Sequence, residues 1–296
     1  MIMLWMALSI SAAFIWAIVN TIDKYVLTNW VKKPIVLVMI LGINGLLVTI
    51  FIYLFHGISQ LSYSNIILAF IAGIFYILMS VFYFKAVKIE EISRVVPLFY
   101  LNPLFVLIFA TIFLKEILTP IKYLGVIFLI IGAVLISSKN FIKFRIGKAF
   151  WFMMLSALAL SISIVITKYL LNFADFWTIF SYISVGTIFA LIPIFYFNFS
   201  DFVSAIKDNN KIVIMIIFLN ELLNVIGVLL ITIATQVGYV TLVNALSSTH
   251  SFFVLLFTVT LSIFYPKILK EKISKPTIML KLIAILLMFI GTILIT

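Results

Sequence analysis

The chain has 296 residues, of which 66% are hydrophobic and 10% charged, and its mean hydropathy is +1.35. A water-soluble domain carries about 25% charged residues, so this composition excludes a soluble globular protein and predicts an integral membrane protein. The net charge of +11 does not indicate nucleic-acid binding, because the basic residues lie between apolar runs, where they set orientation and meet lipid headgroups. The lack of cysteine excludes disulfides, thiolate metal ligands and thiol nucleophiles.

Ten apolar runs are each long enough to cross a bilayer, which takes roughly 20 residues per helix. In chain order they are 1–22, 34–55, 64–84, 95–114, 119–138, 149–167, 176–199, 212–235, 239–265 and 276–296. No run alternates with a period of two, and backbone groups must be paired within lipid, so helices are preferred over a barrel.

An internal repeat divides the chain. The sequence Leu-Lys-Glu at 114–116 returns at 269–271, and each copy runs into a helix that ends in Ile-Gly-x-x-Leu-Ile, at 131–136 and at 290–295. Two copies of five helices each contain an odd number of spans, so the copies must be inverted relative to each other. We therefore predict an all-α membrane protein of ten transmembrane helices in two inverted five-helix repeats, residues 1–143 and 144–296.

The basic residues fit this inversion. Seventeen of the twenty lie on the odd-numbered connections between the ten spans or just beside them, and three on the even-numbered connections. The positive-inside rule then places both termini outside the cytoplasm. Inverted five-helix repeats are a transporter architecture, with the substrate near the membrane midplane where the halves meet.

Part of the sequence resembles a known family. The residues that carry the resemblance are Lys85-Ala86-Val87-Lys88, Ser93, Pro97-Leu98, Asn102-Pro103-Leu104-Phe105, Leu114-Lys115-Glu116, Leu118-Thr119 and the stretch from Gly125 to Gly132. They look like the EamA-type repeat of the drug/metabolite transporter superfamily. The resemblance implies a ten-helix carrier with cytoplasmic termini that exports or exchanges small metabolites, amino acids or lipid-linked sugars, some members coupling to protons. The resemblance and the charge count therefore disagree about the side of the membrane on which the termini lie.

Glu221 is the acidic residue placed deepest in a predicted span, whereas the other acids, Asp23 among them, lie at or outside helix ends. An ionised carboxylate at the centre of a bilayer costs a few kcal/mol, so such a group is a functional candidate by default. Low dielectric disfavours its charged form, which makes it a candidate proton carrier. Asn220 and Asn224 share a helix face and Glu221 adjoins it. The alternative is a permanently protonated carboxyl group bonded to a neighbouring helix.

The ninth predicted span carries Asn244, Ser248 and His250. Asn244 and Ser248 lie four residues apart on one stripe. Histidine titrates near neutrality, so His250 could relay a proton to Glu221. Packing is the favoured interpretation of His250, because polar residues commonly join helices in membranes.

In the fourth span, Pro97 and Pro103 each remove a backbone donor and predict helix breaks, with Tyr100 and Asn102 between them. Broken helices at membrane depth are tolerated where they line a cavity, although a kink can also serve packing alone.

Further stripes could line a pathway or pack the core. They comprise Trp16, Asn20 and Asp23 at i, i+4 and i+7 in the first span, Tyr76 with Ser80 and Tyr83 in the third, and Asn44 between two glycines in the second. Lys24 and Lys168 recur in both halves and are interpreted as interfacial anchors, with a gating ion pair as the alternative. Glu116 and Glu271 are interpreted as members of turn-forming pairs.

The sequence thus predicts a multi-pass protein of the cell membrane that acts as a secondary active transporter. It would move a small metabolite, amino-acid-like or otherwise polar or amphipathic, by alternating access, with protons as a candidate coupling ion. The expected partners are this substrate, protons and membrane lipids, in a monomer or homodimer. We expect no cofactor or metal, since the nucleotide-binding pattern G-x-x-x-x-G-K-[ST] does not occur.

Three alternatives remain open. A flippase for a lipid-linked sugar would need a laterally open groove with basic groups at its mouth. An intramembrane enzyme would need several titratable groups at one depth, and the sequence indicates one deep acid and one helical histidine. A non-transporting membrane subunit would leave Glu221 unexplained.

Overall fold

The computed structural model describes residues 2–102, 104–105, 108–109, 119–137, 147–237, 246–247 and 249–295. These residues form helices α1 (Ile2–Asn29), α2 (Ile35–Phe55), α3 (Tyr63–Ile89), α4 (Ile92–Val95), the 3-10 helix η1 (Val96–Leu101), α6 (Pro120–Ser137), α7 (Lys148–Leu170), α8 (Phe176–Asp208), α9 (Lys211–Val237), α11 (His250–Phe264) and α12 (Lys275–Ile295). Within this part of the chain there is no strand.

Seven of the described helices are long and apolar enough to cross a membrane, and the helices at 92–101, 120–136 and 250–264 are shorter apolar segments. The protein is therefore an all-helical, multi-pass membrane protein, as its composition predicts. The predicted spans 95–114 and 239–265 fall partly outside the described residues.

Two helices run further than the sequence predicts. Helix α1 continues to Asn29 instead of ending at Ile22, because no glycine or proline interrupts the chain before Pro34. Helix α8 continues to Asp208 but is kinked at Asn198, where the backbone leaves the helical region, five residues after Pro193. The extension of α1 brings Asp23 into the body of a membrane-spanning helix.

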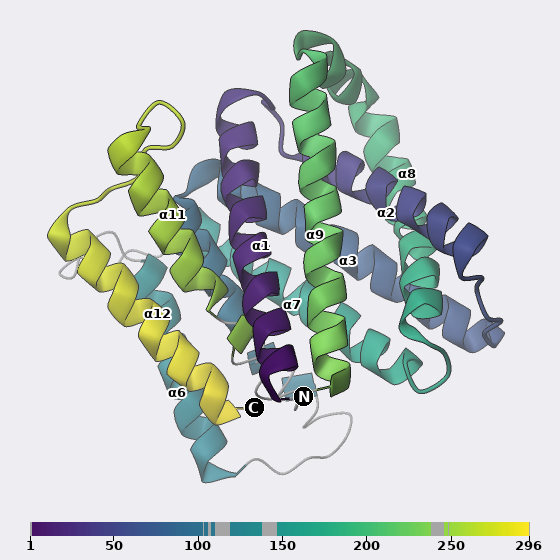
Figure 1. Ribbon diagram of the computed structural model, residues 1–296, viewed down its shortest axis with the longest axis horizontal. Coiled ribbons are helices and arrows are strands. Elements are labelled where there is room, and N and C mark those ends of the chain that lie inside the picture. The colour runs from purple at the N-terminus through teal and green to yellow at the C-terminus, as the bar shows by residue number, and fades with distance from the viewer. Residues whose placement is uncertain are drawn as a thin grey trace.

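The helices pack in a few extensive pairs. Helix α1 lies beside α9, α6 beside α12, and α3 contacts both α7 and α8 (Figure 1). Glycines allow the closest approaches: a Cβ on Gly73 of α3 would lie 2.3 Å from the carbonyl oxygen of Ile183 in α8. The beginning of α1 and the end of α12 lie at the same edge of the bundle in Figure 1.

Side-chain caps and short contacts order the loops at one end. Asp175 begins α8 by accepting hydrogen bonds from the backbone nitrogens of Trp177 and Thr178, at 2.9 and 3.1 Å. The same carboxylate lies 3.6 Å from Nε2 of His56, which follows α2. The connection after α2 and the one after α7 therefore meet at the same face of the bundle.

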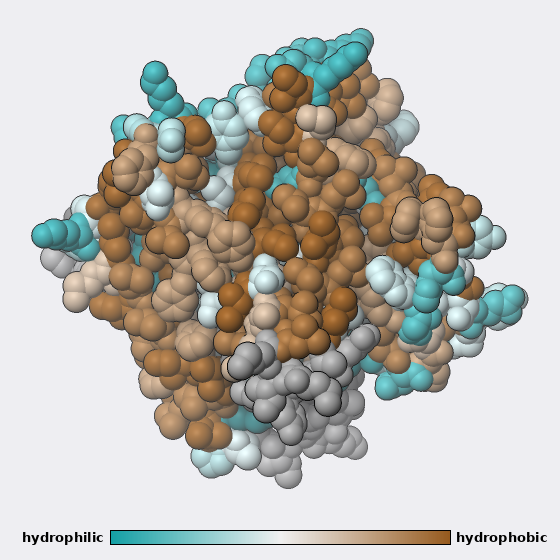
Figure 2. Space-filling view, viewed as in Figure 1, coloured by the Kyte–Doolittle hydropathy of each residue, from teal (hydrophilic) through white to brown (hydrophobic). Residues whose placement is uncertain are grey.

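The surface is apolar where a bilayer would touch it. Figure 2 shows one face of the molecule covered by hydrophobic side chains, with hydrophilic ones gathered at its margins. Large apolar residues such as Phe51, Phe55 and Met279 are exposed, whereas Asp23, Glu221 and several other charged residues are buried. Charge in the interior of a membrane protein is costly, so these buried groups mark where function is to be sought.

Candidate substrate site

Two carboxyl groups lie together where α1, α3 and α9 meet. Asp23 of α1 accepts a hydrogen bond from Nδ2 of Asn220 on α9 at 2.8 Å, and its second oxygen accepts one from the Tyr83 hydroxyl on α3 at 3.1 Å. All three side chains are buried. One acid therefore connects three helices, two from the first half of the chain and one from the second.

Glu221 lies next to this contact. It is buried and close enough to Asp23 for the two carboxyl groups to interact electrostatically. Asn224, one turn further along α9, lies within hydrogen-bonding reach of Glu221 and of the Tyr76 hydroxyl on α3. Two neighbouring buried carboxyl groups disfavour double ionisation, so Asp23 and Glu221 are suited to hold one proton or one cation between them.

Two amide oxygens complete the polar cluster. Asn20 lies one turn before Asp23 on α1, within reach of the Tyr83 hydroxyl. The Oδ1 atoms of Asn20 and Asn220 are buried and accept no hydrogen bond from any described residue. Carboxylates and free amide oxygens are acceptors, so the cluster is chemically suited to a group that donates hydrogen bonds. We refer to Asn20, Asp23, Tyr76, Tyr83, Asn220, Glu221 and Asn224 as the acidic cluster.

Aromatic side chains cover the cluster along α1. Trp16 lies two turns before Asp23 and packs against Gly227 of α9, where an added Cβ would lie 2.6 Å from the indole Nε1. The ring of His250 on α11 lies 6.2 Å from the Trp16 ring and near the Trp16 backbone carbonyl. Within the described part of the chain no hydrogen bond joins His250 to Glu221, and the buried Nε2 of His250 has no hydrogen-bond partner there.

Several predicted site residues lie elsewhere. Asn44 is buried in α2 and donates to the Ile40 carbonyl of its own helix at 3.1 Å. Asn102 accepts from the Ser161 hydroxyl of α7, and Tyr100 lies in η1, which packs against α6 and α7. The hydrogen bonds described for Asn44 and Asn102 go to residues outside the acidic cluster, and α2 and η1 pack chiefly on α8 and on α7, respectively.

The two predicted helix breaks have different outcomes. Pro97 lies in η1, where the α-helical pattern tightens to a 3-10 helix, so the break predicted there is present. Pro103 lies outside the described residues, as do Asn244 and Ser248.

Asp23 and Tyr83 are the cluster members that sequence reasoning undervalues. The expectation that Asp23 lies at or outside the end of the first helix is wrong, because α1 continues for six residues beyond it. The signal is present in the stripe of Trp16, Asn20 and Asp23, whose spacing places all three on one face.

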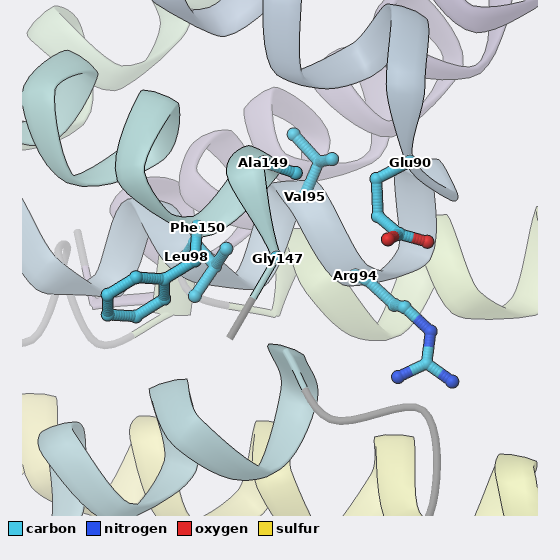
Figure 3. Close-up of a pocket in the computed structure, with 7 residues that line it drawn as sticks. All are labelled: Glu90, Arg94, Val95, Leu98, Gly147, Ala149 and Phe150. Atoms are coloured by element: carbon cyan, nitrogen blue, oxygen red, sulfur yellow. The ribbon is translucent and has the colours of Figure 1, made fainter. Parts of the chain in front are cut away.

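A small pocket lies apart from the acidic cluster. Figure 3 shows its lining, with Glu90 and Arg94 on one side and Leu98 and Phe150 on the other. It belongs to the end of the bundle where α3 is followed by α4. Among the described residues, no group of three acidic or histidine side chains could hold a metal ion.

A bundle of apolar helices that encloses two carboxyl groups, amides and tyrosines, away from lipid, has the properties of a membrane transporter. The comparison with known families agrees. Residues 3–138 match the model described as EamA-like transporter family. The resemblance of the motifs is thus confirmed for the first half.

The whole chain is similar in fold to a solved structure described as "Crystal structure of protein". The two share 18% sequence identity and a TM-score of 0.52, and the match covers 97% of this chain and 96% of that one. At that identity the likeness concerns the fold alone. No curated protein sequence matches this chain.

Proposed function

We propose that this protein is a secondary transporter that moves a small polar or amphipathic metabolite by alternating access, coupled to protons through Asp23 and Glu221. The observation that carries the proposal is the pair of buried carboxyl groups at the contact of α1, α3 and α9. Burying acids in a membrane bundle is costly, and a proton carrier requires buried acids whose charge is gained and lost reversibly.

The architecture proposed is ten helices in two inverted repeats, residues 1–143 and 144–296. Exchange of the halves pairs α1 with α7, α2 with α8, α3 with α9 and α6 with α12. Under this exchange the α1–α9 contact becomes the α7–α3 contact, while the α2–α8 and α6–α12 contacts become themselves, and all four are extensive. This pattern supports an approximate two-fold relation between the halves.

The repeated Ile-Gly-x-x-Leu-Ile motif supports the same relation. A Cβ on Gly132 of α6 would lie 2.9 Å from the Ala284 carbonyl oxygen of α12. A Cβ on Gly291 of α12 would lie 2.8 Å from the Gly125 carbonyl oxygen of α6. Each copy of the motif thus places its glycine against the helix that carries the other copy.

The chemistry of the acidic cluster favours a substrate with an ammonium or another donor group, such as an amino acid. Such a group would meet carboxyl and amide oxygens at a distance from water, where their attraction is strong. A proton and a cationic substrate would compete for the same acids, and this competition is the simplest means of coupling the two fluxes. Export or exchange in the cell membrane follows from this proposal.

Uptake into proteoliposomes tests the proposal. Purified protein is reconstituted and assayed with a panel of radiolabelled amino acids, amines and neutral metabolites, and a fluorescent-lipid scrambling assay is run beside it. We expect flux of at least one donor-bearing solute and no lipid scrambling. Lipid scrambling without solute flux would favour the flippase. The absence of both activities would contradict transport of these classes of solute.

A further inference from the structure

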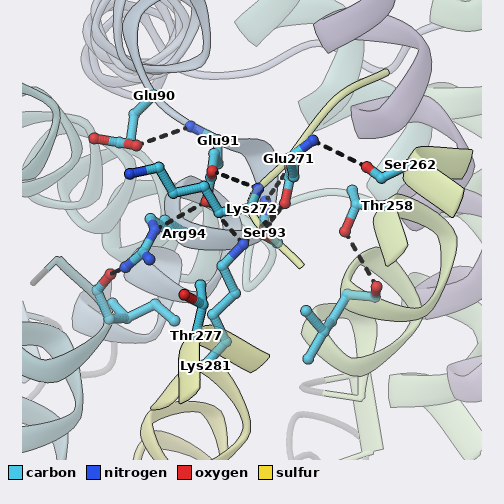
Figure 4. Close-up of polar contacts among 12 residues, drawn as sticks. Glu90, Glu91, Ser93, Arg94, Thr258, Ser262, Glu271, Lys272, Thr277 and Lys281 are labelled. Carbon is cyan, nitrogen blue, oxygen red and sulfur yellow. Dashed lines mark hydrogen bonds and ion pairs between the residues drawn. The ribbon is translucent and has the colours of Figure 1, made fainter. Parts of the chain in front are cut away.

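A second group of buried charges lies at the end of the bundle where α3 is followed by α4. It consists of Glu91 and Arg94 from the first half of the chain and Glu271 and Lys281 from the second, and we call it the ion cluster (Figure 4). Lys281 is 1% exposed and lies on a membrane-spanning helix, α12. Glu271, interpreted from the sequence as part of a turn-forming pair, lies in the connection between α11 and α12 and is buried.

Lys281 joins the two acids. Its Nζ lies 2.8 Å from Oε2 of Glu91 and 3.0 Å from Oε2 of Glu271. Arg94 approaches Glu91 with Nε at 3.0 Å. The four charges balance, so the ion cluster is neutral as a whole.

Backbone contacts tie the same acids across the halves. Glu271 accepts hydrogen bonds from the backbone nitrogen of Ser93, at 3.3 Å, and from the Ser93 hydroxyl. Glu91 accepts one from the backbone nitrogen of Lys272 at 2.9 Å. The chain segment at 91–94 and the segment at 271–272 therefore close against each other at this end of the bundle.

The electrostatic surroundings of Glu91 favour its charged form. Burial raises the pKa of Glu91, but Lys281, the Lys272 backbone nitrogen and Arg94 together hold that pKa below its usual range. Glu91 is thus a carboxylate at neutral pH, and it stays paired as long as the two halves remain together.

Helix α1 connects the ion cluster to the acidic cluster. Lys24 of α1 donates hydrogen bonds to the carbonyl oxygens of Val87 and Glu90, each at 2.7 Å, and interacts electrostatically with Glu271 and Glu91. Asp23, the preceding residue, holds Asn220 in the acidic cluster. Any movement of α1 that alters one cluster therefore acts on the other. These contacts also contradict the interpretation of Lys24 as an interfacial anchor.

Stability does not explain such an arrangement. Replacing a buried ion pair by apolar residues is often neutral or stabilising, so a buried ion pair is weak evidence of a purely stabilising role. The ion cluster joins parts of the chain that alternating access would move relative to each other.

We infer that Glu91, Arg94, Glu271 and Lys281 form the gate that separates the acidic cluster from water at this face of the membrane. The inference rests on the proposed transport function. In this structure the gate is closed, and its opening would require the Lys281 contacts to the first half to break.

Cysteine labelling tests the gate without any substrate, because the chain contains no cysteine. Ser80→Cys places a reporter on the buried face of α3 that carries Tyr76 and Tyr83, with little change in volume. The substitutions Lys32→Cys and Gln60→Cys, at exposed positions that follow α1 and α2 respectively, mark the two faces. A membrane-impermeant maleimide is added to reconstituted protein from each face.

The double variant Glu271→Gln/Lys281→Met removes the two ion pairs of Lys281, with Glu91 and with Glu271, and leaves Glu91 and Arg94 paired. We expect the Ser80→Cys reporter to react about tenfold faster from the Lys32 face, the scale of a typical coupling free energy. The matched control Asp208→Asn/Lys270→Met removes the same charges from exposed positions and should leave the rate unchanged. If the first double variant does not fold, Glu91→Gln/Arg94→Met serves in its place.

An unchanged labelling rate in a folded double variant would overturn the gate. If uptake into proteoliposomes persists in that case, the transport proposal stands while the gate fails. If the wild type transports no solute but its reporter responds to the double variant, the transport proposal fails and the ion cluster is a closure with another purpose.

Discussion

At the scale of single residues, the decisive feature is which polar side chains are buried together. Asp23 and Glu221 lie on different helices and come from different halves; Asp23 accepts hydrogen bonds from Asn220 and Tyr83, and Glu221 lies within reach of Asn224. A solvated carboxylate needs no such partners, so their presence indicates that these side chains stabilise a buried carboxylate charge.

Asp23→Asn should separate function from stability. The amide can keep one hydrogen bond to Asn220 while removing a desolvated acid, so we expect the melting temperature in detergent to stay equal or rise. Coupled flux should fall at least about tenfold, in line with the functional role expected of costly intramembrane acids. Asp201→Asn, which removes a surface acid paired with Lys33, is the control. A large loss of stability in Asp23→Asn with normal flux would make Asp23 a structural residue.

Sequence reasoning found part of this site. Glu221 stands out because it lies in the middle of an apolar run, and Asn220 and Asn224 follow from helical spacing. Asp23 could not be recognised in the same way, because an Asp-Lys pair after an apolar stretch ordinarily ends a membrane span. Only the packing of α1 against α9 shows that the helix continues and turns this acid inward.

At the scale of elements, glycines decide how closely the helices approach. Gly291 faces backbone atoms of α6, the Gly125 oxygen at 2.8 Å and the Leu129 nitrogen at 2.9 Å, and a backbone cannot move aside as a side chain can.

Gly291→Ala should destabilise the protein by about 1–3 kcal/mol through overpacking between α6 and α12. Thermal unfolding in detergent measures this effect. Gly147→Ala is the matched control, because a Cβ there meets nothing within 4 Å. Equal melting temperatures for the two variants would contradict the close α6–α12 contact.

The cap of α8 gives a pH-dependent prediction. Burial raises the pKa of Asp175, but hydrogen bonds from Thr178 and Trp177 and the nearby His56 lower it more, so it lies below its ordinary value. A depressed folded-state pKa contributes stability that is present above the unfolded-state pKa and is lost as pH falls through the folded-state value.

Asp175→Ala should therefore cost about 1 kcal/mol at pH 7, and this difference from the wild type should shrink below about pH 4. Melting temperatures of both proteins measured from about pH 7 to about pH 3 test it. A difference that stays constant over this range would show that the carboxylate charge does not contribute to the cap.

Most helices could be predicted from apolar length alone, whereas the kink of α8 at Asn198 and the 3-10 turn of η1 could not be placed precisely. Proline predicts that a helix is perturbed, but neighbouring helices decide whether the chain bends there or some residues later.

At the scale of the whole molecule, the proposed division into two repeats rests on short motifs that recur along the chain. The Ile-Gly-x-x-Leu-Ile motif relates α6 to α12, and the recurrence of Lys24 as Lys168 relates α1 to α7. The ion cluster could not be predicted, because its first two members, Glu91 and Arg94, lie about 180 residues before Glu271, and no spacing rule reaches that far.

Topology can be mapped with the substitutions Lys32→Cys and Gln60→Cys. The two cysteines should react from opposite faces, and the charge count places position 32 on the cytoplasmic side. Labelling of both from one face would contradict the membrane-spanning assignment of α2, and an external position 32 would favour cytoplasmic termini.

The central claim is that the two carboxyl groups couple a proton to the solute, and solute flux driven by an imposed pH gradient in proteoliposomes tests it most directly. The wild type and Asp201→Asn should respond equally to the gradient, while Glu221→Gln should fold, as judged by its melting temperature, and show no gradient-driven flux. Gradient-driven flux of wild-type size in folded Glu221→Gln would contradict the claim.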